Sequence, residues 1–354
     1  MTDFAFRALP WNVVFGIGAV ERLPAEMDAL GLDRALVLCT PGSQARGRLI
    51  AKQLGDRAAG LFADARMHVP STVLDEASRR ARDLGAKSTV SIGGGSTTGL
   101  GKALAAREGL DNVAIPTTYS GSEMTDIWGV TESGRKVTSR DARVVPTLTI
   151  YDPNLTVSLS ARMSASSGLN ALAQAVVNVA ADKPSPIASA LAVEGIRALA
   201  KALPRVVTEP NDLEARSEAL YGACIAAGAL GVGSTGLHHR LCHTLGGTFG
   251  TPHAETHAIL LPHSVAYNAT ALPAGTQKVA DALGVADAPA GIYELAKQLG
   301  APTALRQLGV GEGDLDRVAE IVARPSAPVR PPAPIDRVRT LLQNAFEGLP
   351  PQRV

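Results

Sequence analysis

Residues 88–103 read "STVSIGGGSTTGLGKA", and this stretch decides how the first half of the chain folds. Residues 88–96 are typical of a buried strand that runs into glycines, and a helical pattern follows directly. Glycines at a helix N-terminus let a pyrophosphate approach free N–H groups and the positive end of the helix dipole. The spacing is neither G-x-G-x-x-G nor a G-K-S/T loop, so a plain strand–helix turn stays open as an alternative.

The flanking sequence repeats the same alternation of strand and helix. Strands are predicted at 34–40 and 58–65, and a strand with its following turn at 112–123. Helices are predicted near 43–54, 71–86 and 97–108, with Ser71 or Thr72 as an N-cap of the second. This alternation predicts a parallel, doubly wound sheet. Hydroxyl side chains end the fourth strand, next to the glycine turn. We expect a nucleotide to be bound by the two turns together, through Gly94, Gly95, Ser96, Thr97, Thr117, Thr118 and Ser120.

The pattern changes after residue 159. From there the chain is predicted to be helical, at 162–181, 185–203, 211–230, 235–247, 254–268, 274–284, 290–299, 301–308, 312–323 and 335–346. We therefore predict an α/β domain at 1–159 and an all-helical domain at 160–354. A cleft between two such domains is the expected ligand site.

The bulk composition excludes several classes of protein. Thirty-four basic and 33 acidic residues leave a net charge of +1, which predicts no binding to nucleic acid or to an acidic membrane. Three cysteines without paired spacing fit a reducing compartment. The N-terminus lacks the apolar run of a signal peptide, and we expect a cytoplasmic protein.

Six of the seven histidines lie in one segment, "GLHHRLCHTLGGTFGTPHAETHAILLPH" at 236–263. Together with "FGIGAVERL", "SIGGGSTTGLGKA", "AIPTTYSGSEMTDIWGVTE", "TIYDPNLTVSL" and "SSGLNALAQAV", this segment resembles the iron-containing (group III) alcohol dehydrogenase family over residues 15–263. The resemblance implies a Rossmann-like nucleotide-binding domain and a helical domain, as in dehydroquinate synthase-like folds. It also implies NADH or NADPH as the hydride donor, and a homodimer.

Within the family the chain looks most like the maleylacetate reductases. These enzymes reduce the carbon–carbon double bond of maleylacetate to give 3-oxoadipate during the degradation of aromatic compounds. Thr40 ends the first strand where an acid could hold the adenosine ribose, so the choice between NADH and NADPH stays open.

Metal-dependent members of the family hold their ion with an Asp and a His four residues apart on one helix, and with two later histidines. The later pair corresponds to His239 and His253, but the first pair reads Asn170 and Gln174. Amide oxygens are poor ligands for iron or zinc. From these four positions we expect no catalytic metal.

The retained histidines then predict an acid–base site. Hydride addition to maleylacetate gives an enolate, which imidazole and amide groups can stabilise and protonate. We expect His243 and His253 to be catalytic with support from His239. The dicarboxylate substrate is expected to be bound by Asn170, Gln174, Lys136 and His257.

Two further hypotheses stay open. One is a metal-dependent alcohol or polyol dehydrogenase of the same fold, and the other is a noncatalytic nucleotide-binding relative. His238 and His263 are interpreted as packed residues and Cys242 as a buried thiol. Besides Lys136, cations are offered by Lys102 and by the segment that contains Arg135, Arg140 and Arg143.

Overall fold

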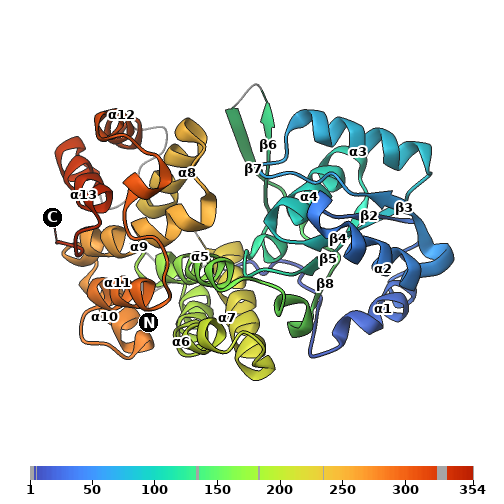
Figure 1. Ribbon diagram of the computed structural model, residues 1–354, viewed down its shortest axis with the longest axis horizontal. Helices are drawn as coiled ribbons and strands as arrows, with labels where there is room; N and C mark the ends of the chain where they lie inside the picture. Colours follow the sequence, from blue (N-terminus) through green and yellow to red (C-terminus); the bar gives the residue numbers. More distant parts are fainter. Residues whose placement is uncertain are drawn as a thin grey trace. The chain divides into compact units, whose positions relative to one another are not determined.

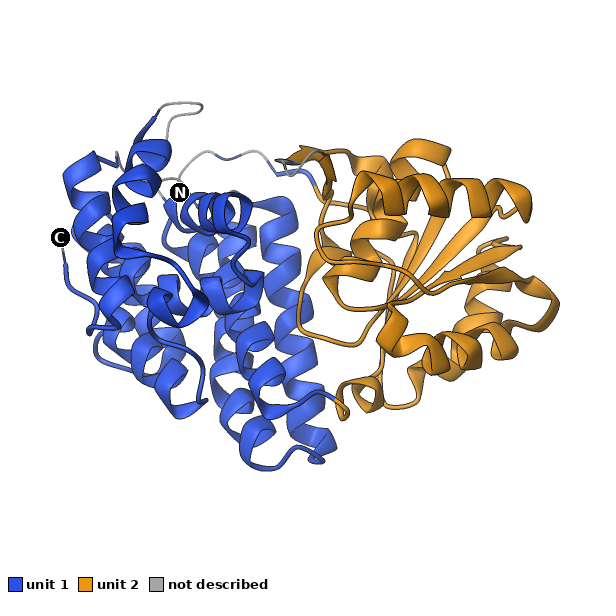
Figure 2. Cartoon of the chain, turned by 45° about the horizontal axis from the view of Figure 1, so that its top comes forward, with its two compact units in different colours: residues 1–7, 159–354 blue, residues 8–158 orange. Residues whose placement is uncertain are grey.

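The computed structural model describes residues 4, 6–132, 135–181, 184–233, 235–324 and 333–353, without the side chains of Arg135 and Lys136. The chain divides into two compact units (Figure 2). Residues 8–158 form an α/β unit, and residues 1–7 and 159–354 form a helical unit. Each unit is described separately below.

The α/β unit is built on a parallel six-stranded sheet with the strand order β1-β8-β5-β4-β2-β3 (Figure 1). Its strands are β1 (Val13–Phe15), β2 (Ala35–Leu38), β3 (Ala58–Phe62), β4 (Ser88–Gly93), β5 (Asp111–Pro116) and β8 (Leu148–Tyr151). The helices of this unit are α1 (Leu23–Ala29), α2 (Gln44–Leu54), α3 (Ser71–Asp83) and α4 (Gly95–Glu108). The predicted fold class, a parallel-sheet domain with a helical domain, is confirmed.

Strand β2 shows why the sheet is covered on both faces. All four of its residues are buried, as expected for a central parallel strand. Leu36 and Leu38 pack in the cluster that contains residues of α3 and α4, whereas Val37 packs in the cluster that contains residues of α1 and α2. Side chains alternate between the faces of a strand, so one short apolar run supplies both cores.

Three local features differ from the sequence prediction. Helix α3 begins at Ser71 with Pro70 as its N-cap, and no side chain caps it, because proline has no side-chain oxygen to accept from the free N–H groups of the first turn. Strand β1 was not predicted, since it is only three residues long, and β8 was not predicted although it is as long as β2. An antiparallel hairpin, β6 (Ile127–Glu132) with β7 (Arg135–Arg140), occupies a segment that was predicted to be a connection.

The helical unit contains nine α-helices in its described residues. They are α5 (Ala161–Val179), α6 (Pro186–Thr208), α7 (Leu213–Val232), α8 (Leu237–Phe249), α9 (His253–Ala269), α10 (Pro273–Leu283), α11 (Ala288–Gln298), α12 (Leu315–Ala323) and α13 (Ile335–Glu347). Segment 301–308, predicted as a helix, forms only a 3-10 turn at Leu305–Leu308. A buried cluster joins α8 and α9 to α12 and α13, and includes Leu241, Leu260 and Leu341.

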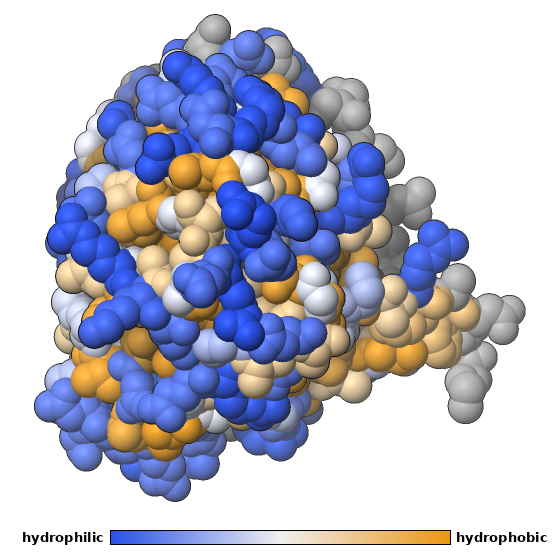
Figure 3. Space-filling model, turned by 90° about the vertical axis from the view of Figure 1, so that its right-hand side faces the viewer, coloured by the Kyte–Doolittle hydropathy of each residue, from blue (hydrophilic) through white to orange (hydrophobic). Residues whose placement is uncertain are grey.

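Hydrophilic and apolar residues are interspersed on the face of the molecule shown in Figure 3. Among the described residues no single helix is long and apolar enough to cross a membrane. Helices α7 and α8 meet that criterion only as a pair, which is bent by 98° at its break.

Candidate functional site

In the α/β unit the two polar turns that follow β4 and β5 lie side by side. The strands are paired in register, with Gly93 opposite Pro116, and the Thr117 amide donates a hydrogen bond to the Gly93 carbonyl at 2.9 Å. A Cβ atom on Gly94 would lie 3.0 Å from Thr118 Oγ1, and one on Gly95 would lie 3.6 Å from Ser120 Oγ. The backbone of the first turn therefore lies directly against the hydroxyl groups of the second.

The N-terminus of α4 has the properties that an anion requires. Its N-cap is Gly94, and no side chain caps the helix. Gly94, Gly95 and Ser96 are partly exposed, so their backbone can reach a ligand. Thr97 differs, because its side chain is fully buried and its Oγ1 would lie 2.4 Å from a Cβ atom on Gly93. The amide of Thr97 donates to the Gly94 carbonyl at 3.1 Å, and the predicted role of Thr97 in cofactor binding stays a prediction.

Lys102 holds the second turn in place. Its side chain is fully buried, and Nζ donates to the Ser122 carbonyl at 2.8 Å, the Thr125 carbonyl at 2.7 Å and Thr125 Oγ1 at 3.1 Å. Burial lowers the pKa of the ammonium to about 7, although the nearby Glu123 carboxylate acts in the opposite direction. With all three donors used internally, Lys102 is a structural residue and not a ligand for cofactor or substrate.

The other predicted cations are paired locally. Arg140 donates to Asp126 at 2.8 Å, and Arg143 forms an ion pair with Asp141 at 2.6 Å, which lowers the pKa of that carboxyl. Lys136 lies in β7, but its side chain is outside the described part of the chain, as is that of Arg135. Its predicted role in substrate binding stays a prediction.

In the helical unit, five histidines from two helices form one cluster. His238, His239 and His243 come from α8, and His253 and His257 come from α9. The loop between the helices is three residues long, Gly250 adopts a left-handed conformation with φ 67°, and the helices pack against each other. This turn brings together imidazoles that are up to 19 positions apart in the sequence.

The exposure of the five histidines increases from the interior of the cluster to the surface. His257, His238 and His239 are buried, His253 is partly buried and His243 is exposed. The ring centroids of His257 lie 4.4 Å from His253, 4.7 Å from His238 and 5.1 Å from His239. The rings of His243 and His253 are stacked, with centroids 6.2 Å apart. His257 is therefore the centre of the cluster.

Burial decides the charge of the inner imidazoles. Desolvation lowers the pKa of His239 to about 3, and it lowers those of His238 and His257 well below the usual value. These three rings are neutral at pH 7. The predicted catalytic roles of His243 and His253, with support from His239, stay predictions.

The amides predicted to bind substrate lie on α5, which packs against α9. Asn170 and Gln174 are both buried, with 3% and 5% of their surfaces exposed. An ion pair between Arg162 at the start of α5 and Glu255 in the first turn of α9, at 2.6 Å, joins the two helices.

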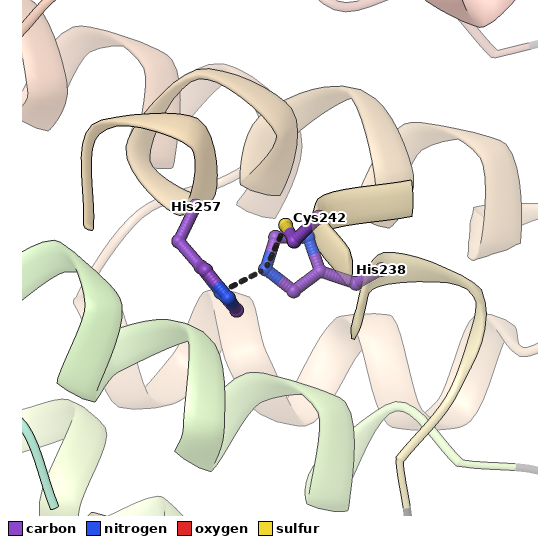
Figure 4. Close-up of side chains that lie close together, drawn as sticks. All are labelled: His238, Cys242 and His257. Carbon is purple, nitrogen blue, oxygen red and sulfur yellow. Dashed lines mark hydrogen bonds between the residues drawn. The ribbon is translucent and has the colours of Figure 1, made fainter. Parts of the chain in front are cut away.

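A second chain of contacts passes through the inner part of the cluster (Figure 4). His238 Nδ1 lies 3.0 Å from Ser264 Oγ, and His238 Nε2 lies 2.9 Å from His257 Nδ1. Cys242 Sγ lies 3.7 Å from His238 Nε2, and burial raises the pKa of this thiol well above its usual value. The potential ligand atoms of His238, Cys242 and His257 all lie within 4.8 Å of one another.

Comparisons with known proteins agree with this architecture. The family model described as "Iron-containing alcohol dehydrogenase" matches residues 10–153, and "Fe-containing alcohol dehydrogenase family, C-terminal" matches residues 164–346. A maleylacetate reductase from Burkholderia cepacia is 48% identical over 351 residues, covering 99% of this chain and 100% of that protein.

Solved structures give the same result. A maleylacetate reductase from Agrobacterium tumefaciens superimposes with a TM-score of 0.95 at 46% identity, covering 99% of this chain and 100% of that one. An iron-containing alcohol dehydrogenase from Corynebacterium glutamicum has a TM-score of 0.91 at 38% identity, covering 98% and 97% of the two chains. The chain belongs to the iron-containing alcohol dehydrogenase family, and it is an oxidoreductase.

Family membership corrects the expectation of no metal, because an iron-containing family implies a bound ion. That expectation rested on the ligand preferences of four positions and did not include the group that folding forms from His238, Cys242 and His257. The donors fit a divalent transition ion. Neutral imidazole is a good ligand for iron and zinc, and burial has removed the competing proton from His239 and His257.

Sequence reasoning missed two residues of this site. His238 was interpreted as a packed residue, because it points about 100° away from His239 on an ideal helix. Ser264 carried no signal of its own. The spacing of His238 and Cys242, one helical turn apart, was the available clue, but only the packing of α8 on α9 shows that His257 completes the group.

Proposed function

We propose that this chain is a maleylacetate reductase that uses NADH or NADPH to convert maleylacetate to 3-oxoadipate. The observation that carries the proposal is the 48% identity to the Burkholderia cepacia maleylacetate reductase across the whole of both chains. We propose that the turns after β4 and β5 bind the cofactor. We propose separately that the histidine cluster and α5 bind the substrate.

The reaction sets clear requirements for the protein. Hydride from the reduced nicotinamide adds to the alkene carbon that is β to the ketone, and the π electrons move to form an enolate. A proton then adds to the neighbouring carbon, and the cofactor leaves oxidised. The protein must stabilise an oxyanion and supply one proton.

The different exposure of the histidines supports an assignment of oxyanion stabilisation and proton supply. Neutral, buried His239 and His257 cannot supply a proton at pH 7. The outer pair, His243 and His253, is in contact with solvent, which can return the proton after each turnover. We assign proton delivery to His243, because His253 is also a candidate metal ligand. We assign substrate binding to the side chains of Asn170 and Gln174, which are buried on α5.

The metal that the family implies would be held by His239 and His253, with amide oxygens of Asn170 and Gln174 as weaker donors. When bound, such an ion supplies Lewis acidity toward the enolate oxygen. Burial of His239 keeps its ring deprotonated and thus able to bind a cation at neutral pH.

An assay with the purified protein tests the proposal. Maleylacetate and either NADH or NADPH should give 3-oxoadipate, with one reduced cofactor consumed per product. Simple alcohols or polyols with the oxidised cofactors serve as comparison substrates. Turnover of alcohols without turnover of maleylacetate would favour the dehydrogenase hypothesis. Cofactor binding without any turnover would favour a noncatalytic role.

A further inference from the structure

A strained segment of backbone lies beside the helix that follows the glycine turn. His68 and Val69 have φ angles of 63° and 47°, and they are two of the three non-glycine residues with positive φ in the described part of the chain. The left-handed conformation is unfavourable for residues with a side chain, and it is most unusual for a β-branched one. Such backbone persists only where the surrounding structure holds it, and it is concentrated at functional sites.

Hydrogen bonds hold this segment in place. Thr131 in β6 donates twice, from Oγ1 to the His68 carbonyl at 2.9 Å and from its amide to the Val69 carbonyl at 3.0 Å. The Val69 amide donates to the Arg66 carbonyl at 3.2 Å. Val69 is thus fixed through both its amide and its carbonyl, and only 4% of its surface is exposed.

The side chain of Val69 lies where α4 has no side chain of its own. A Cβ atom on Gly99 would lie 3.1 Å from Val69 Cγ2, which is closer than ordinary van der Waals contact. The valine methyl group therefore takes up the space that a side chain at residue 99 would need. A glycine inside a helix is itself unfavourable relative to alanine. Two locally unfavourable features, a left-handed valine and a helical glycine, meet in this one contact.

This contact lies one helical turn from the glycine turn that is proposed to bind the cofactor. Gly95 and Gly99 are four residues apart in α4, so they lie on the same face of the helix, and both are partly exposed. Val69 ends the loop that follows β3, and β3, β2, β4 and β5 are parallel neighbours, so the loops after them leave the same edge of the sheet. The packing of Val69 therefore affects the position of the first turn of α4 at that edge.

We propose that Val69 is a positioning residue for the nicotinamide cofactor, because its contact with Gly99 fixes the first turn of α4 in the orientation that binds the pyrophosphate. The valine acts through the backbone of α4 and does not touch the cofactor. The strained backbone brings the valine to the helix, and the glycine lets it approach. The inference rests on the proposed function, since it requires that the glycine turn binds NADH or NADPH.

Equilibrium binding of NADH to the protein without substrate tests this role. In a titration followed by nucleotide fluorescence, Val69→Ala should raise the dissociation constant about 10-fold, the loss expected for one hydrogen bond to a charged phosphate. Val73→Ala is the matched control, because Val73 is buried in the same apolar cluster, with 3% of its surface exposed, and the substitution removes the same number of carbon atoms. The control should lose stability but bind NADH as the wild type does. Unchanged affinity in Val69→Ala, or equal weakening in both variants, would leave Val69 with a packing role only and refute the proposal.

Steady-state kinetics give a second readout that a purely structural role would not produce. Val69→Ala should raise KM for NADH by a factor similar to that for the dissociation constant. It should leave kcat at saturating NADH close to the wild-type value, because the residue acts on cofactor binding and not on the reacting atoms. A fall in kcat with an unchanged KM would contradict the positioning role.

Urea unfolding tests the strained contact independently of the cofactor. Glycine usually destabilises a protein relative to alanine, but the order reverses at positive φ, so Val69→Gly should be at least as stable as Val69→Ala. Gly99→Ala should stabilise the Val69→Ala variant more than it stabilises the wild type, because its methyl group then has room. Lower stability of Val69→Gly would refute the strained conformation. Equal effects of Gly99→Ala in the two backgrounds would refute the contact.

The failure of this inference can be told apart from the failure of the proposed function. A wild-type protein that binds neither NADH nor NADPH would refute the proposed function, and the role of Val69 with it. Binding by the wild type, with the same affinity in Val69→Ala, would refute the role of Val69 alone.

Discussion

Replacing Lys102 by Met should destabilise the α/β unit and loosen the turn that is proposed to bind the cofactor. The substitution keeps the length of the side chain but removes three hydrogen bonds. The Ser122 carbonyl still accepts from Thr125, whereas the buried Thr125 carbonyl loses its donor. One unsatisfied buried carbonyl costs about 1–3 kcal/mol in free energy of unfolding.

The loss in free energy of unfolding that Lys102→Met causes should depend on pH. The pKa of Lys102 is lowered from its ordinary value of 10.5 to about 7 in the folded protein. Between these values the unfolded chain binds more protons than the folded chain, so the wild-type free energy of unfolding rises with pH. Titration of Lys102 raises the wild-type free energy of unfolding by up to about 1.4 kcal/mol per pH unit, and the Lys102→Met variant lacks this contribution. The difference in free energy of unfolding between the wild type and Lys102→Met should therefore grow from pH 7 towards pH 9.

Urea unfolding followed by tryptophan fluorescence measures this difference. Both tryptophans of the chain, Trp11 and Trp128, lie in the α/β unit, so the signal reports on that unit. Lys52→Met, at an exposed site on α2, is the matched control and should show no such dependence. A difference that is constant with pH would refute the reasoning. It would show that the three acceptors keep the buried amine protonated throughout.

Three further predictions concern the site itself. His243→Ala should lower kcat for maleylacetate by about 10²- to 10⁴-fold, because it removes a proton donor, and near-normal kcat would contradict that role. The double substitution of Asn170→Asp and Gln174→His should raise the affinity for Zn²⁺, since an anion and an imidazole replace two amides. A competition titration with a chromophoric chelator measures this affinity, and weaker binding than in the wild type would contradict the prediction. Gly94→Ala should raise KM for NADH, because its Cβ would lie 3.0 Å from Thr118 Oγ1, and an unchanged KM would argue against a cofactor in this turn.

Local patterns in the sequence were sufficient to predict the fold class. The run at 88–103 places a buried strand, a glycine turn and a helix in order, and its neighbours repeat the alternation, so a parallel sheet follows from chain geometry. The same patterns missed β1, because three residues carry too little periodicity to be recognised, and they also missed β8. They missed the β6–β7 hairpin as well, whose second strand, "RKVTSR", is mainly polar.

The histidine site was only partly readable from the sequence. The segment 236–263 and its family resemblance identified the imidazoles, but a histidine has no fixed charge or role until its surroundings are known. Packing of α8 on α9 removed water from His239 and lowered its pKa to about 3, which no sequence pattern reports. The expectation of no metal failed for the same reason, since it considered four aligned positions without the groups that folding places beside them.

The sequence by itself determined which elements form and which chemical groups are present. The tertiary structure alone decided which of those groups are in contact and which of them are protonated. Ser264, His238 and His257 are joined into one hydrogen-bonded chain only because α9 lies against α8. Hydrogen bonds and desolvation act over a few ångströms in space, irrespective of separation along the chain, and so the tautomer of a single imidazole depends on the whole fold.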